Sequence, residues 1–114
     1  MSKAVPPREA YPKWPSVKVE VLPPVYVKAM QFRSRLIDVI EKYIENGWAS
    51  SYSDFAVRAG IGHTVLSRIL SGDVWPSTAV LAQLEQAVEL PLWPHQRSIK
   101  SDRRPKGYDK TGQE

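Results

Sequence analysis

The chain contains no cysteine, which excludes disulfides, thiol catalysis and cysteine-ligated zinc sites and fits a reducing compartment. It also lacks an apolar run long enough to cross a bilayer. Prolines interrupt the opening stretch MSKAVPPREAYPKWP, where a secretory signal would need an apolar helix. We therefore expect a soluble intracellular protein without a membrane partner.

Histidine is scarce, and the familiar chemical motifs are missing. The two histidines, His63 and His95, are far apart in sequence and have few acidic neighbours, so no metal site is expected. The sequence has no nucleophile elbow, phosphate loop or paired-carboxylate constellation. We expect neither an enzyme nor a bound cofactor.

Positive charge is in excess but unevenly distributed. The 114 residues carry a net charge of +4, to which residues 1–24 contribute +2, residues 95–114 contribute +3 and residues 25–94 contribute −1. A basic protein can bind a polyanion, but many small basic proteins bind nothing acidic. Charge alone therefore leaves the partner open.

The two ends of the chain differ in composition from its middle. Residues 1–24 are rich in proline and predict an extended arm, in which valines alternate with charged residues over SVKVEVL and indicate a short strand. Residues 95–114 have few large apolar side chains and predict a flexible basic tail. An isolated strand is unstable, so residues 17–22 would need a second copy or a protein partner to pair with.

Residues 25–94 show helical periodicity and predict an all-α domain. Apolar side chains recur every three or four residues in four segments separated by glycine, asparagine or proline. Ser53 and Ser77 are expected as N-caps, and Gly62 begins the third segment. The expected helices span residues 25–47, 53–59, 62–71 and 77–90.

Residues 52–72 contain a helix pair with a specific spacing of small and apolar residues. The spaced positions are Ala56, Gly60, Ile61, Leu66 and Ile69, followed by Gly72 and Pro76. On these positions the chain resembles the lambda repressor and Cro family of helix-turn-helix proteins over roughly residues 35–92. It departs from the family at Tyr52, where glutamine is frequent, and at Gly62, where serine or threonine is usual.

The resemblance implies a small four-helix, lambda repressor-like domain whose helix 62–71 lies in the major groove of double-stranded DNA. The base contacts it implies are His63, Thr64, Ser67 and Arg68, with Arg68 suited to a bidentate contact with guanine. The backbone contacts expected are Ser51, Tyr52, Ser53 and Arg58, together with Lys100, Arg103, Arg104 and Lys106 of the tail. A surface ion pair of Arg68 with Asp54 or Asp73 is the competing interpretation.

The resemblance implies a transcriptional regulator, a phage-type repressor in the cytoplasm of a bacterium or a phage-infected cell. The alternative is an antitoxin-like or regulatory protein-interaction module that uses the same fold and binds little or no DNA. In that case the expected strand at residues 17–22 could extend a partner's sheet. A homodimer and a monomer are both compatible with the sequence.

Overall fold

A computed structural model of the chain describes residues 5–94, and every regular element in that range is helical. The expected all-α class is therefore confirmed, whereas the strand expected within residues 17–22 is wrong. The elements are α1 (Pro7–Ala10), a 3-10 turn (Val19–Val21), α2 (Pro24–Glu45), α3 (Tyr52–Arg58), α4 (His63–Ser71) and α5 (Thr78–Val88).

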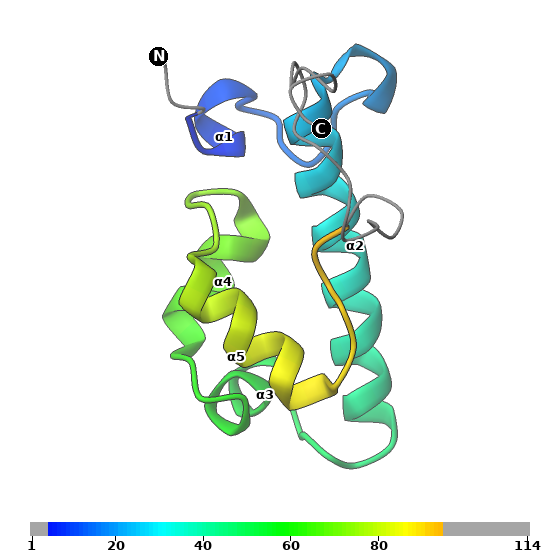
Figure 1. The fold of residues 1–114 in the computed structure, drawn as a ribbon, viewed down its shortest axis with the longest axis vertical. Helices are drawn as coiled ribbons and strands as arrows, with labels where there is room; N and C mark the ends of the chain where they lie inside the picture. Colours follow the sequence, from blue (N-terminus) through cyan, green and yellow to red (C-terminus); the bar gives the residue numbers. More distant parts are fainter. Residues whose placement is uncertain (1–4, 95–114) are drawn as a thin grey trace, which may run out of the picture.

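Helix α2 runs along one side of the molecule, and α3, α4 and α5 gather on the other (Figure 1). It starts at Pro24, where the missing N–H costs nothing, and ends before Gly47, which has a φ of 89°. Its apolar stripe faces the shorter helices, with Leu36 and Ile40 wholly inaccessible to solvent. The spacing of the sequence predicted both this stripe and its ends.

The core joins α2 to each of the three shorter helices. Phe55 of α3, Leu66 of α4 and Leu84 of α5 are almost completely buried in one cluster, which Leu92 closes after α5. Burying side chains of this size contributes about 1.5–3 kcal/mol each. The orientation of α4 is thus fixed from beneath by packing against α2 and α3.

The turn between α3 and α4 follows the expected chemistry, with one correction. Gly60 has a φ of 86°, and the Ile61 N–H donates to the Ala56 carbonyl at 2.9 Å, which turns Ile61 into the core. The N-cap of α3 is Ser51, whose Oγ accepts the Asp54 N–H at 3.1 Å, so the expected cap at Ser53 is wrong. Ser53 lies inside the first turn instead.

Residues 5–22 fold back onto the domain, so the extended arm expected there is also wrong. Trp14 and Leu22 pack with Tyr26 and Ala29 of α2 in a second apolar cluster. The Leu22 N–H donates to the Val19 carbonyl at 3.0 Å, which closes a 3-10 turn. A strand requires a neighbouring edge, whereas anchoring Leu22 on α2 needs only this local turn.

The docked segment also contacts the turn that follows α4. The Arg8 N–H donates to the Gly72 carbonyl at 2.9 Å, and the Arg8 side chain pairs with Asp73 at 3.4 Å. Tyr26 donates its hydroxyl to the Val5 carbonyl at 2.8 Å. Residues 5–22 therefore connect the start of α2 to the turn that follows α4, and we call them the N-terminal clamp.

Candidate nucleic-acid interface

The outward face of α4 carries every side chain that the sequence predicted to contact bases. His63, Thr64, Ser67 and Arg68 are exposed, while Leu66 on the opposite face is 2% exposed. The N-terminal clamp contacts the chain at Gly72 and Asp73, at the other end of this helix. The first turn of α4 is therefore accessible to a large ligand.

Arg68 makes no ion pair within residues 5–94. Asp73 pairs with Arg8, and Asp54 pairs with Arg58 at 3.0 Å. Both carboxylates that the sequence offered as partners of Arg68 are thus engaged by other arginines. The Arg68 guanidinium lies on the same exposed face as His63 and Thr64.

The start of α3 presents hydroxyls beside an acidic group. Ser51 and Ser53 are exposed, and Asp54 accepts the Ser50 N–H at 2.9 Å. That backbone hydrogen bond, followed by the one from Arg58, lowers the pKa of Asp54 below its ordinary value. The Ser51 oxygen accepts a hydrogen bond at its cap, which leaves its O–H as a donor for a phosphate.

Two of the predicted backbone contacts are already engaged. The Tyr52 hydroxyl donates to Glu41 Oε2 at 2.7 Å, and Arg58 pairs with Asp54 while lying 5.9 Å from the Trp48 ring centre. Tyr52 has a single O–H donor, so a phosphate would have to displace Glu41 to receive it. Lys100, Arg103, Arg104 and Lys106 lie outside the described residues.

Tyr52 makes the stability of the fold sensitive to alkaline pH. Burial, and then the hydrogen bond to Glu41, raise its pKa from 10.0 to about 12. Because the folded chain holds this proton more tightly than the unfolded chain, its contribution is complete below pH 10 and is lost as the pH rises toward 12.

We expect Tyr52→Phe to remove part of this alkaline loss of stability, as measured by urea unfolding at pH 8, 10 and 11. Burial also raises the pKa of Tyr26, so Tyr26→Phe is the comparison that isolates Tyr52. A pH dependence identical in wild type and Tyr52→Phe would contradict the assignment.

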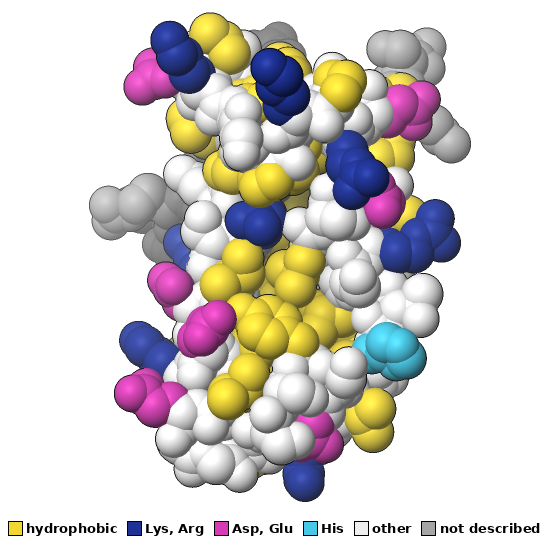
Figure 2. Space-filling model, turned by 180° about the vertical axis from the view of Figure 1, so that it is seen from behind, with side chains coloured by type: hydrophobic (Ala, Val, Ile, Leu, Met, Phe, Trp, Pro, Cys, Tyr) yellow, Lys and Arg dark blue, Asp and Glu magenta, His cyan; other side chains and the backbone are white. Residues whose placement is uncertain are grey.

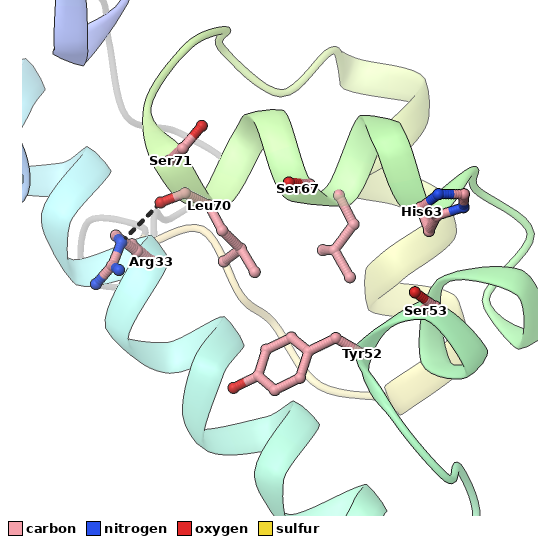
Figure 3. A pocket seen from close by; sticks show the side chains of 8 residues that line it. Arg33, Tyr52, Ser53, His63, Ser67, Leu70 and Ser71 are labelled. Atoms are coloured by element: carbon pink, nitrogen blue, oxygen red, sulfur yellow. Dashed lines mark hydrogen bonds between the residues drawn. The ribbon is translucent and has the colours of Figure 1, made fainter.

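A hollow opens between α2, α3 and α4 beside the outward face of α4, with a volume of about 460 Å³. Its lining is mainly apolar and consists of Arg33, Tyr52, Ser53, His63, Leu66, Ser67, Leu70 and Ser71. Figure 3 shows Arg33 near the last turn of α4 and His63 at the first turn, with the Tyr52 ring across the hollow from α4. We call this cavity the α2–α4 hollow.

The hollow joins predicted base-contact residues to predicted backbone-contact residues. Ser67 and His63 were expected at bases, Tyr52 and Ser53 at the backbone, and all four line this one cavity. Sequence reasoning did not single out Arg33. The available signal was its spacing of three and seven residues before Leu36 and Ile40, which places it beside the apolar stripe.

Positive and negative side chains balance in the described part of the chain. Residues 5–94 contain nine basic and nine acidic side chains. Figure 2 shows hydrophobic side chains in the middle of the face that bears His63, with charged groups of both signs around them. Within the described range, His, Asp and Glu form no group of three or more that could hold a metal, and no helix is long and apolar enough to span a membrane.

The candidate interface is thus an exposed helix face beside a hollow that contains one guanidinium.

No protein-family model matches the chain, and neither does any curated protein or solved structure.

Proposed function

We propose that the protein is a sequence-specific regulator that binds double-stranded DNA through α4. The observation that carries the proposal is the outward display of His63, Thr64, Ser67 and Arg68 over the first two turns of a helix packed from beneath. Helices α3 and α4 with their short glycine turn then act as a helix-turn-helix, whose second helix enters the major groove. An imidazole, two hydroxyls and a guanidinium supply both donors and acceptors for base edges.

Such a protein would act as a repressor of the phage type, by occupying a promoter. Bound α4 needs no chemical step, which agrees with a sequence that contains no catalytic motif. Two copies on a two-fold operator would place their α4 helices about 34 Å apart, one helical turn of DNA.

Arg68 is the side chain on which sequence discrimination should depend most. We expect Arg68→Ala to weaken binding to the selected site by about 1–3 kcal/mol and to relax the preference at one base pair. The measurement is selection of bound sites from a random duplex pool, followed by titration on the selected site and on a random duplex. Arg58→Ala removes the same charge from an arginine that is already paired with Asp54, and is the matched control.

An equal loss on selected and random duplex would assign Arg68 to a phosphate and refute base readout. Discrimination that falls equally in Arg58→Ala and Arg68→Ala would point to net charge as the cause.

A protein-interaction module is the second candidate, and two observations favour it. Residues 5–94 carry no net charge, and Val19 and Val21 expose 47% and 67% of their surface. Extension of a partner's sheet through residues 17–22 is no longer the favoured mode, because this segment forms a 3-10 turn. A purified protein that binds no duplex at low salt would support this candidate, since DNA binders acquire non-specific affinity from phosphate contacts.

A further inference from the structure

The α2–α4 hollow combines an apolar lining with a guanidinium group. Leu66, Leu70 and the Tyr52 ring give it an apolar lining, while Arg33 is the one arginine or lysine among its lining residues. A bare inorganic anion would gain nothing from the apolar surface, and a purely apolar ligand would gain nothing from the guanidinium. The hollow suits a ligand that carries an apolar group next to a negative charge.

Arg33 is held in place by one of its nitrogens. Its Nε donates to the Leu70 carbonyl at 2.8 Å, which ties α2 to the last turn of α4 and leaves four further N–H donors on Nη1 and Nη2. Within residues 5–94 it makes no ion pair, in contrast to Arg8 and Arg58. A guanidinium anchored in this way presents its two amino groups in a fixed fork, the geometry that binds phosphate oxygens in pairs.

The nucleic-acid backbone has the composition that the hollow requires. It alternates deoxyribose rings, which have apolar faces, with phosphodiesters that each carry one negative charge. The hollow shares His63 and Ser67 with the outward face of α4, so a backbone unit seated there would lie alongside the groove that α4 enters.

We propose that the α2–α4 hollow binds one sugar–phosphate unit of the DNA backbone, with Arg33 on the phosphate and the Tyr52 and Leu70 side chains against the sugar. This inference rests on the proposed DNA-binding function and adds a contact from α2 to those on α3 and α4. Backbone contacts fix the register of a protein on the duplex without reading sequence. Arg33 is therefore a positioning residue for α4.

The test compares Arg33→Gln with Arg35→Gln, which removes the same charge two residues further along α2. Arg35 lines a different cavity and its Nη1 lies 3.5 Å from the Leu92 carbonyl. We expect Arg33→Gln to weaken binding roughly tenfold on selected and random duplex alike, and to reduce the slope of log K against log salt by about one. Arg35→Gln should leave the slope unchanged.

Arg33→Lys provides a variant that retains the charge if Arg33→Gln loses stability with its bond to Leu70. It should keep most of the salt slope but lose affinity, because an ammonium cannot bind a phosphate in a bidentate manner. Thermal unfolding of each variant identifies the samples that are folded at the temperature of titration.

Equal changes of slope in Arg33→Gln and Arg35→Gln would overturn the proposal, because net charge alone would then explain them. An unchanged slope in Arg33→Gln, with Arg68→Ala still relaxing one base position, would overturn it while the proposed function stands. Wild-type protein that binds no duplex would overturn both.

Discussion

Replacing Trp14 with alanine is expected to lower the free energy of unfolding by about 3–5 kcal/mol. Trp14 is 6% exposed, and its ring lies 6.4 Å from the rings of both Tyr11 and Tyr26. The side chain joins the N-terminal clamp to α2 and reaches the turn after α4, so its removal opens a cavity that these elements share. A loss of this size is a large part of the stability of a small domain.

Gly72 lies against Trp14 in this contact, so a substitution at Gly72 tests the same packing independently. Its φ is 84°, and a Cβ at this position would lie 2.5 Å from Trp14 Cδ1. Gly72→Ala should therefore carry two separate costs in the wild type: the left-handed backbone, about 1–2 kcal/mol, and the displacement of Trp14. In a Trp14→Ala background only the backbone cost and a 3.3 Å approach to the Arg8 nitrogen remain.

Urea unfolding of the wild type, both single variants and the double variant forms a thermodynamic cycle that measures the coupling. We expect Gly72→Ala to cost at least about 1 kcal/mol less when Trp14 is absent, because neighbouring residues couple by this order. Additive costs would show that the clamp does not pack on this turn in solution. Trp14→Phe retains part of the apolar surface and serves if Trp14→Ala does not fold.

The clamp illustrates what could not be predicted from the sequence. Val17, Val19 and Val21 alternate with charged residues, so the pattern favoured a strand, but period two indicates only which side chains share a face. Whether a strand forms depends on a partner edge, and within residues 5–94 none exists. The docking of Trp14 on Gly72 joins residues far apart in sequence, and no local pattern encodes it.

The helices of the domain were more predictable because their signals are local. The stripe through Leu36 and Ile40, the stop at Gly47 and the cap at Ser77 each depend on residues within a turn or two. The outward face of α4 followed from the same periodicity, since buried Leu66 and Ile69 fix which side faces out. Arg33 was missed because its role depends on the Leu70 carbonyl, 37 residues away in sequence.

The largest functional effect should come from the tail. Deleting residues 97–114 removes six basic and three acidic residues, whereas residues 5–94 carry no net charge. We expect the truncated protein to lose roughly a hundredfold in affinity for every duplex at low salt, because it loses phosphate-neutralising charges. The plot of log K against log salt has a negative slope. If Lys100, Arg103, Arg104 and Lys106 each neutralise one phosphate, the magnitude of this slope should decrease by about 3–4.

Two matched variants separate the effect of the tail's charge from the effects of its residue order and its length. Replacing the four basic residues by glutamine keeps the length, and a tail of the same composition in scrambled order keeps the charge. The glutamine variant should behave like the deletion, and the scrambled tail like the wild type, because phosphate neutralisation needs charge near the duplex and little else. Loss of binding in the scrambled tail would instead indicate a specific contact, of the kind that arms make in a minor groove.

The tail and Arg33 predictions constrain one another, because both are measured on the same salt slope. Arg33→Gln should remove about one unit from the slope and tail deletion about three to four, and the two losses should add because the contacts are independent. Discrimination between selected and random duplex should survive the deletion, since the proposed function assigns it to α4 and the tail would contribute to both affinities alike. A slope left unchanged by the deletion would mean that residues 5–94 neutralise phosphates with their own nine basic side chains, and the tail would then have no part in DNA binding.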